Sequence, residues 1–346
     1  MKAGRYGASA LVWVLLLTYA SLYPFHPLRP PTVETVSNLL LNARSYIRSD
    51  IAFNFVAYVP FGTLLCLFFR SRGDEGRAIL KAVAVAAGFS FVMELAQLFI
   101  PGRVSSVIDL AANTAGAVAG ALVFADPFYS MVTRPLAHLR ERTVIAGGWG
   151  DAALVLLMLW LLAQLNPALP FFGAGDIARG IEPELGALQW AAVALGICGF
   201  GLFVSALVRA ETGSLRVTLL LLTVALWLKF AAASLMLQPH SSPDWASGGR
   251  VGGLIAGILA FVPLRKLARL GRIYLALVLI LAGALFAKVF GAYSALDELL
   301  RLFRWPYGQL GSFATLTRFI HELWPFAAVM FLVALFFHVR HAPRTE

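Results

Sequence analysis

The stretch ELAQLFIPGRVSSVIDLAANTAGAVAG, residues 94–120, decides the fold because it joins two apolar segments through a short polar turn. Although most of its positions are apolar, it holds two acids, two amides and one arginine: Glu94, Gln97, Arg103, Asp109 and Asn113. A charged side chain within a bilayer costs at least about 2.5–3.5 kcal/mol on insertion scales, so such residues usually mark a site or a pathway. The stretch predicts a hairpin of two membrane helices with a polar end.

The composition of the whole chain predicts a polytopic integral membrane protein. Its 346 residues are 60% hydrophobic and 13% charged, whereas a soluble domain is roughly 45–50% apolar and about 25% charged. Cys66 and Cys198 lie in separate apolar segments, which argues against a disulfide framework or a zinc site. The net charge of +10 comes from basic residues in short loops, which indicates membrane orientation rather than nucleic-acid binding. We therefore expect membrane lipids as partners, and neither a metal, a cofactor nor a nucleic acid.

The fold class that we expect is all-α, with about ten transmembrane helices. A helix needs about 20 residues to cross a hydrocarbon core of roughly 30 Å. The first segment follows Lys2 and Arg5 but lacks a small-residue cleavage site, so it predicts a retained helix rather than a signal peptide. The predicted spans are residues 8–23, 51–69, 78–99, 107–125, 150–166, 187–208, 215–236, 250–264, 272–290 and 320–339.

The basic residues between the segments predict the orientation of the chain. If ten helices alternate in direction, sixteen of the basic residues fall on one side, whereas the loops on the other side are longer and mix both signs of charge. The positive-inside rule then places both termini in the cytoplasm. The sixteen residues are Lys2, Arg5, Arg70, Arg72, Arg77, Arg134, Arg140, Arg142, Arg209, Arg216, Arg265, Lys266, Arg269, Arg272, Arg340 and Arg344.

A basic, polar segment divides the chain into two predicted membrane domains. Residues 1–125 hold four of the apolar segments, residues 126–149 form a cytoplasmic linker, and residues 150–346 hold about six more. Weak similarity between residues 21–27 and 164–170 leaves open that the second domain is a degenerate repeat of the first.

Four residues of the fourth segment share one face of the predicted helix. The spacings from Asp109 to Asn113, Gly116 and Gly120 are those of one helical stripe. The two glycines are expected to let another helix approach closely. Ser106 is expected to cap the start of this helix, with Asp109 in the first turn.

Glu94 and Gln97 are three residues apart, so they share a face of the preceding helix, and Arg103 lies in the turn between the helices. Two interpretations fit this arrangement. The polar residues either lock the hairpin through an acid–arginine pair, or they form a ligand-binding pocket open to the outer face of the membrane. We favour the pocket, because one ion pair suffices for a lock and this hairpin carries more polar groups.

The second segment contributes polar residues at the same level. Asp50 and Asn54 are four residues apart at its outer start, and both are expected to line the pocket. Pro60 and Gly62 follow in the same segment, where they are expected to kink the helix and open space beside it.

This ordered set of residues resembles the VanZ-like family of bacterial membrane proteins. The resemblance covers residues from about 10 to 125 and rests on Asp50, Asn54, Tyr58, Pro60, Phe61, Gly62, Glu94, Gln97, Arg103, Asp109, Asn113, Gly116 and Gly120. It implies a multi-pass protein of the bacterial cytoplasmic (inner) membrane. It also implies a link to glycopeptide resistance, because the family is named for a protein associated with resistance to teicoplanin. Many members carry an acid where this chain has Ser106, so one carboxylate fewer is expected here.

Several functions stay open. The leading hypothesis is a pocket for the headgroup of a lipid-linked glycan or peptidoglycan precursor, in which Arg103 meets a phosphate or carboxylate. The alternatives are a membrane-embedded enzyme with Glu94 or Asp109 as general base, a transporter, and a scaffold for envelope enzymes. Polar residues deeper in the membrane would favour transport, but Lys229 and Lys288 are expected to snorkel to the surface instead. The sequence assigns no catalytic residue and no oligomeric state.

Overall fold

A computed structural model gives the fold of the chain. It describes residues 2–23, 48–101, 105–123, 134–169, 186–209, 213–238, 248–290 and 307–341, together with residues 25, 27–33, 36–37, 103, 131 and 301. The chain folds into two compact units. Unit 1 comprises Met1–His138 and Pro306–Leu316, and unit 2 comprises Leu139–Trp305 and Thr317–Glu346.

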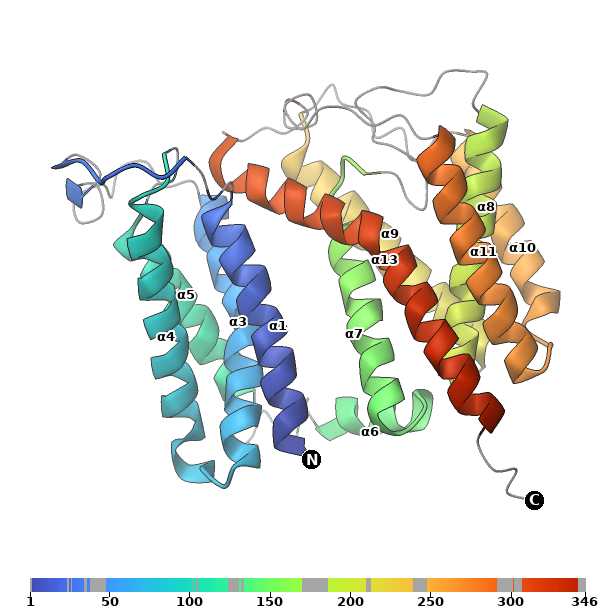
Figure 1. Ribbon diagram of the computed structural model, residues 1–346, viewed down its shortest axis with the longest axis horizontal. Helices are drawn as coiled ribbons and strands as arrows, with labels where there is room; N and C mark the ends of the chain where they lie inside the picture. The colour runs from blue at the N-terminus through green and yellow to red at the C-terminus, as the bar shows by residue number, and fades with distance from the viewer. Residues whose placement is uncertain are drawn as a thin grey trace. The chain divides into compact units, whose positions relative to one another are not determined.

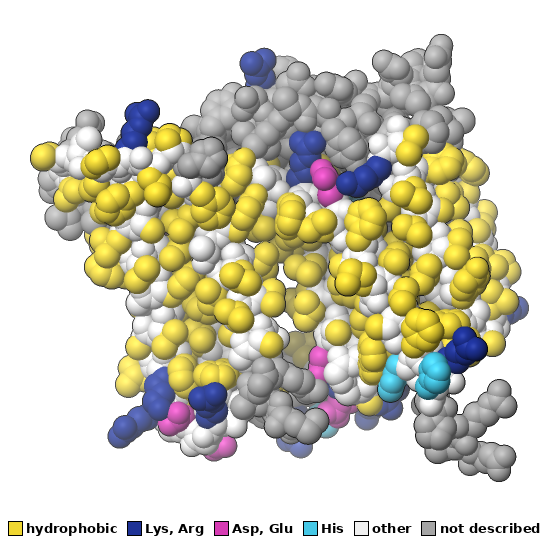
Figure 2. All heavy atoms as spheres, in the orientation of Figure 1, with side chains coloured by type: hydrophobic (Ala, Val, Ile, Leu, Met, Phe, Trp, Pro, Cys, Tyr) yellow, Lys and Arg dark blue, Asp and Glu magenta, His cyan; other side chains and the backbone are white. Residues whose placement is uncertain are grey.

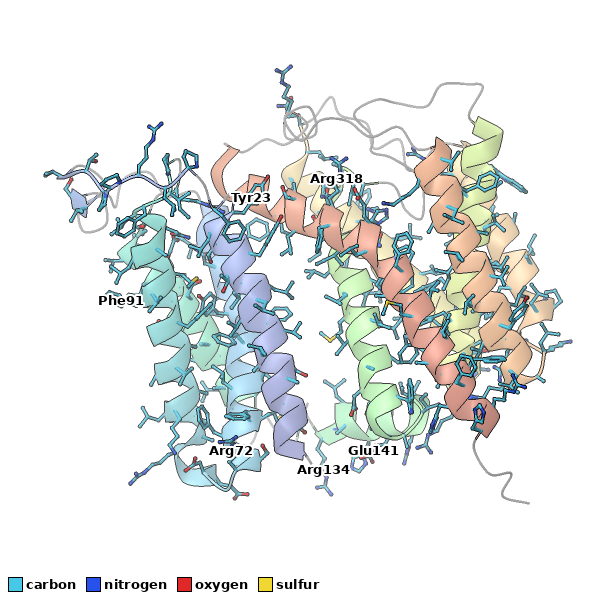
Figure 3. The ribbon with its side chains drawn as sticks, viewed as in Figure 1. Tyr23, Arg72, Phe91, Arg134, Glu141 and Arg318 are labelled. Carbon is cyan, nitrogen blue, oxygen red and sulfur yellow. The ribbon has the colours of Figure 1, made fainter. Side chains whose placement is uncertain are left out.

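In its described part, unit 1 is a bundle of antiparallel helices. The helices are α1 (Lys2–Leu22), α3 (Arg48–Ser71), α4 (Ala78–Gln97) and α5 (Val107–Leu122), with the short 3-10 helix η1 (Glu75–Arg77) before α4. Helix α3 lies in contact with α1, α4 and α5 (Figure 1). Tyr23, which follows α1, and Arg72, which follows α3, lie at opposite ends of the bundle (Figure 3). The α4–α5 turn is therefore at the Tyr23 end.

Unit 2 surrounds one enclosed helix. Its helices are α7 (Gly147–Gln164), α8 (Gly186–Leu207), α9 (Ser214–Met236), α10 (Gly248–Leu264), α11 (Arg269–Phe290) and α13 (Tyr307–His341), of which α13 enters this unit at Thr317. Helix α6 (Arg134–Thr143) crosses the boundary between the units in sequence. Helix α8 packs against α9, α10 and α11, and 72% of its segment Trp190–Leu207 is buried. Glu141 and Arg318 mark opposite ends of unit 2 (Figure 3).

Among the described residues, seven helices are long and apolar enough to cross a membrane. They are Ile51–Ser71, Glu75–Gln97, Gly147–Gln164, Trp190–Leu207, Ser214–Met236, Arg269–Phe286 and Phe313–His341. Three shorter apolar helices, Tyr6–Leu22, Val107–Leu122 and Arg250–Leu264, have 10–17 residues. The prediction of an all-helical, multi-pass membrane protein is therefore confirmed.

The sides of the helices expose large hydrophobic side chains. Figure 2 shows hydrophobic side chains along the sides of each unit and charged ones mostly near the helix ends. Leu80 on α4 is 70% exposed and Trp227 on α9 is 69% exposed. Because soluble proteins rarely expose apolar surface of such extent, these faces are suited to lipid chains.

Helices α3 and α5 touch through their backbones, because glycines lie at the contact. A Cβ atom added to Gly116 would lie 2.1 Å from a carbonyl oxygen of α3, and one added to Gly120 would lie 1.9 Å from another. From the α3 side, Gly62 would place a Cβ atom 2.1 Å from a carbonyl of α5. Thr63 Oγ1 donates a hydrogen bond of 2.9 Å to Gly120 O. Pro60, inside α3, lies between Val59 and Gly62, which both take part in this contact.

A buried lysine in unit 2 contradicts one expectation. Lys229 on α9 does not snorkel: it is 0% exposed, and its Nζ donates hydrogen bonds of 3.0 Å to Asn166 O and 2.8 Å to Leu169 O. These carbonyls lie in the segment that follows α7, and backbone carbonyls are strong hydrogen-bond acceptors. They offer the ammonium group a nearer partner than the membrane surface. Lys288, in contrast, is exposed.

Candidate functional site

The turn between α4 and α5 is held by Glu94. This side chain is buried, and its Oε2 accepts a hydrogen bond of 2.8 Å from Ser106 N. The backbone oxygen of Glu94 accepts a second bond of 2.7 Å from Ser105 Oγ. Glu94 therefore fixes the start of α5 from the end of α4. This satisfies buried backbone and hydroxyl groups that would otherwise be costly.

Ser106 caps α5. Its backbone is extended, and its Oγ accepts hydrogen bonds from Ile108 N at 3.0 Å and from Asp109 N at 3.4 Å. A side-chain oxygen at this position satisfies amide groups that the first helical turn leaves without partners. Asp109 lies in that first turn, where a negative charge is favoured by the helix dipole, and its side chain is buried.

Asn113 lies one helical turn further into the membrane and joins α5 to α4. Its Nδ2 donates a hydrogen bond of 2.9 Å to Ser90 Oγ, and both side chains are buried. Its Oδ1 is buried and accepts no hydrogen bond from any residue that the structure describes. The hydroxyl of Tyr58 on α3 is buried close to Ser90, and it makes no hydrogen bond to a residue that the structure describes. Three helices thus bring hydroxyl and amide groups together.

Arg103 and Gln97 hold the end of α1. Arg103 donates two hydrogen bonds, from Nε to Tyr23 O over 3.1 Å and from Nη2 to Ala20 O over 2.8 Å. Gln97 Nε2 donates a hydrogen bond of 3.1 Å to Ser21 O. Carbonyls at a helix C-terminus lack partners within the helix and carry partial negative charge, so a cation is favoured there. Burial lowers the pKa of the Arg103 guanidinium, and the negative charge of Glu94 opposes this shift. The side chains of Arg103 and Gln97 therefore connect the hairpin to the end of α1.

The other predicted residues lie on α3. Asn54 is partly buried, four residues before Tyr58 on the same face. Asp50 lies in the first turn of the helix, and its side chain falls outside the described residues. In the described part of the chain, no three His, Cys, Asp or Glu side chains gather as metal ligands would.

Sequence reasoning missed Ser90. It precedes Glu94 by four residues and Gln97 by seven, so all three share one face of α4. This spacing could have identified it, but a serine within an apolar helix is a weak signal because it often bonds only to its own backbone.

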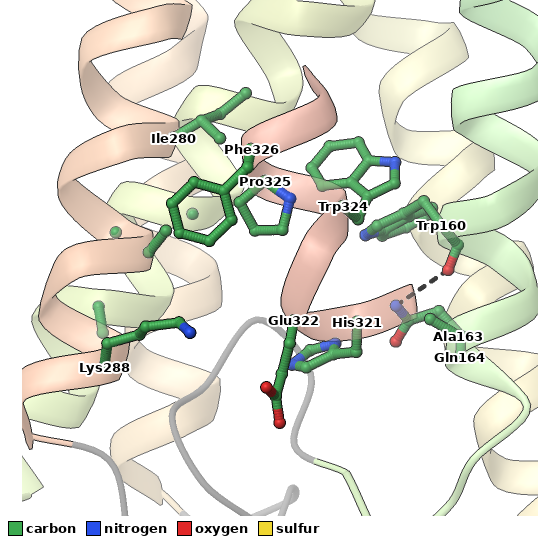
Figure 4. A pocket seen from close by; sticks show the side chains of 14 residues that line it. Trp160, Ala163, Gln164, Ile280, Lys288, His321, Glu322, Trp324, Pro325 and Phe326 are labelled. Atoms are coloured by element: carbon green, nitrogen blue, oxygen red, sulfur yellow. Dashed lines mark hydrogen bonds between the residues drawn. The ribbon is translucent and has the colours of Figure 1, made fainter. Parts of the chain in front are cut away.

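Sequence reasoning also missed a cavity in unit 2. A cavity of about 80 Å³ opens among α7, α8, α11 and α13. Figure 4 shows aromatic side chains, including Trp160 and Trp324, at one end of it and polar side chains at the other. Gln164 Nε2 donates a hydrogen bond of 3.2 Å to Trp160 O. The Oε1 of Gln164 is buried and accepts no hydrogen bond from a described residue. The polar end comprises Gln164, Lys288, His321 and Glu322. The sequence signal for this cavity was the pair of adjacent polar residues His321 and Glu322 at the start of an apolar segment.

Comparison with known proteins addresses the first part of the chain. No curated protein and no solved structure matches the chain. The family model described as VanZ/LLP1 matches residues 7–130, which include every residue of the polar hairpin. The N-terminal part of this membrane protein is therefore a VanZ-like domain, as its motifs predicted.

Proposed function

We propose that the VanZ-like domain binds the headgroup of a lipid-linked glycan or peptidoglycan precursor at the polar end of its α4–α5 hairpin. The buried carboxamide of Asn113 carries this proposal. Its nitrogen bonds to Ser90, whereas its oxygen has no donor among the described residues. An unsatisfied buried acceptor costs about 1–3 kcal/mol. A hydroxyl group of a bound sugar would supply the missing donor.

Arg103 supplies the positive charge for the anionic part of the headgroup. A guanidinium carries five N–H donors in a fixed plane, which suits phosphate and carboxylate oxygens. The bonds of Arg103 to Ala20 O and Tyr23 O orient this plane at the end of the hairpin. The anion of the ligand would then lie above the sugar-binding amide, nearer to the membrane surface.

The hydrogen bonds of Glu94 support binding rather than catalysis. A general base must reach the proton that it removes. Glu94 Oε2 instead accepts a hydrogen bond from the backbone N–H of Ser106, and the backbone oxygen of Glu94 accepts one from Ser105 Oγ. This carboxylate is thus used to build the turn. We therefore retain the membrane-embedded enzyme, the transporter and the scaffold only as alternatives that the binding experiment addresses.

The proposed topology places the hairpin on the outer face of the bacterial cytoplasmic (inner) membrane. We propose ten spans with both termini in the cytoplasm. Seven of the ten predicted spans correspond to the seven longer helices, and the other three overlap the three shorter apolar helices. With ten spans, the sixteen basic residues named above fall on one side of the membrane, which the positive-inside rule assigns to the cytoplasm. In this topology, the headgroup of a lipid-linked glycan in the outer leaflet would meet the polar end of the hairpin.

Binding of a defined probe tests the proposal. The full chain, purified in detergent, is titrated with an undecaprenyl-diphosphate-linked peptidoglycan disaccharide and with undecaprenyl diphosphate alone, and complexes are counted by native mass spectrometry. We expect the glycan-linked probe to bind more tightly. The variant Asn113→Ala should lose about tenfold in affinity for it and little for the diphosphate alone.

Thr114→Ala is the matched control, because Thr114 Oγ1 donates only within its own helix, to Leu110 O at 2.7 Å. Its affinity should equal that of the wild type. Equal binding of both probes, or an Asn113→Ala variant that binds as the wild type does, would refute a sugar-binding pocket. Release of a cleaved product from the probe would establish the enzyme instead.

We also propose that this binding underlies a link to glycopeptide resistance. Expression in a teicoplanin-susceptible bacterium should raise the inhibitory concentration of teicoplanin, and Asn113→Ala should abolish the rise at equal abundance. A rise that persists in Asn113→Ala would separate resistance from the polar hairpin.

A further inference from the structure

A basic pocket lies at one end of unit 2, away from the cavity of Figure 4. It forms where α8 and α13 end and where α7 and α11 begin, and its volume is about 560 Å³. Figure 2 shows histidine and basic side chains gathered where α13 ends. Among the described residues that line it, none is acidic. The lining consists of Ile145, Ala146, Trp149, Val208, Arg209, Arg269, Arg272, Leu335, His338 and Val339.

Backbone carbonyls orient two of the three arginines without neutralising them. Arg209 Nε donates 3.2 Å to Val144 O, and Arg272 Nη1 donates 2.8 Å to Ser205 O. The Nε of Arg272 is buried and donates to no residue that the structure describes. Carbonyls carry no formal charge, so three guanidinium groups face one space with their charges intact. An anion is the ligand that this arrangement favours.

Two helix starts and two helix ends meet at the pocket. Ala146, the N-cap residue of α7, lines the pocket, and Arg269 begins α11. The start of a helix carries partial positive charge and N–H groups without partners, so it attracts anions and disfavours arginines. The ends of α8 and α13 carry partial negative charge, and Arg272 bonds to Ser205 O at the end of α8. The net positive charge of the pocket therefore comes from the three guanidinium groups themselves.

The walls of the pocket are apolar, which distinguishes a lipid from a free anion. Trp149 stacks on His338 with their ring centroids 5.1 Å apart, and Leu335 and Val339 lie on the same helix as His338. Tryptophan is enriched where lipid headgroups meet acyl chains. Basic pockets between membrane helices bind the phosphates of anionic lipids. A ligand with a phosphate and an apolar body matches both parts of the lining.

Orientation in the membrane does not by itself require this arrangement. Arg216 and Lys266 belong to the same predicted basic set, yet neither lines the pocket. The positive-inside rule counts charges near helix ends and does not require them to converge. We infer that unit 2 binds the phosphate headgroup of an anionic phospholipid between Arg209, Arg269 and Arg272, with Trp149 against its glycerol and acyl region.

Lipid retention by the full chain tests this inference. Purified protein is titrated with phosphatidylglycerol or phosphatidylcholine of the same acyl chains, and bound lipid is measured by native mass spectrometry. We expect preferential binding of phosphatidylglycerol. Arg269→Gln should weaken it by about tenfold, because it removes one of the three guanidinium charges that line the pocket. Arg272→Lys, which keeps the charge but loses the planar fork, should weaken it less.

Arg216→Gln is the control, since it removes the same charge from an exposed position at the start of α9. It should bind as the wild type does. Equal binding of the two lipids would overturn the inference, and so would an equal loss in Arg269→Gln and Arg216→Gln. Displacement of phosphatidylglycerol by millimolar inorganic phosphate would show a site for free anions rather than for lipid. The hairpin variant Asn113→Ala should leave phosphatidylglycerol binding unchanged, which separates this site from the proposed glycan pocket.

Discussion

Asn113 Nδ2 donates a hydrogen bond to Ser90 Oγ over 2.9 Å, and this bond joins α5 to α4 across a buried contact. The bond uses one half of the carboxamide and leaves Oδ1 for another donor. The two residues are 23 positions apart in sequence and lie on opposite arms of the hairpin. The contact therefore contributes both to the stability of the hairpin and to the proposed binding of a headgroup.

A double-mutant cycle separates these contributions. Ser90→Ala and Asn113→Ala should each destabilise the full chain in detergent, with a coupling energy of about 0.6 kcal/mol, the mean for hydrogen bonds between membrane helices. Unfolding in sodium dodecyl sulfate, followed by circular dichroism, measures it. In the cycle of Ser90→Ala with Thr114→Ala the effects should add, because Thr114 bonds within α5. Additive effects in the first cycle would show that the bond contributes nothing.

Gly120→Ala should destabilise unit 1 strongly. The added Cβ atom would lie 1.9 Å from Val59 O, so α3 and α5 must move apart. Overpacking of this kind costs about 1–3 kcal/mol, and backbone atoms cannot rotate away as a side chain can. The same unfolding measurement detects the loss.

Gly88→Ala on α4 is the matched control, because nothing lies within 4 Å of the atom that it adds. Alanine forms helices better than glycine does, so this variant should be as stable as the wild type or up to about 1 kcal/mol more stable. A Gly120→Ala variant that is equally tolerant would mean that α3 and α5 are not in backbone contact.

Arg103→Lys should loosen the end of α1. Arginine donates to two carbonyls, Ala20 O and Tyr23 O, from separate nitrogens of one plane, and lysine cannot reproduce this fork. Amide hydrogen exchange of residues 15–23 should become faster by about tenfold or more, corresponding to a loss of about 1.5 kcal/mol for a hydrogen bond to a charged group. Arg29→Lys, at an exposed side chain, should leave this exchange unchanged.

Cysteine labelling in intact cells tests the proposed topology. Leu28 is 69% exposed at the Tyr23 end of unit 1, and Arg72 is exposed at the other end. A membrane-impermeant maleimide should label Leu28→Cys and not Arg72→Cys. The native thiols give little background, because Cys66 is 0% and Cys198 4% exposed. Labelling of Arg72→Cys alone would reverse the topology, and labelling of both would mean that one of the positions was assigned to the wrong side.

The sequence predicts those parts of the fold that depend on local patterns. Apolar length gives the helices, and Ser106 is recognisable as a cap because it precedes an apolar run and has Asp109 three residues later. The long-range partners are not predictable in this way. The bonds of Arg103 to Tyr23 O and Ala20 O join positions 80 and 83 residues apart, and backbone carbonyls have no signature in sequence. For the same reason Lys229 was expected at the surface: its acceptors are carbonyls of residues 60 and 63 positions away.

Helix α5, with 16 residues, is short for the layer that it occupies. At 1.5 Å per residue it is about 24 Å long, whereas the hydrocarbon core is roughly 30 Å thick. Such hydrophobic mismatch is relieved by local thinning of the bilayer. We therefore expect the membrane to dip at the α4–α5 turn, so that a headgroup at the lipid surface reaches Asn113 over a shorter depth than the span count alone would suggest.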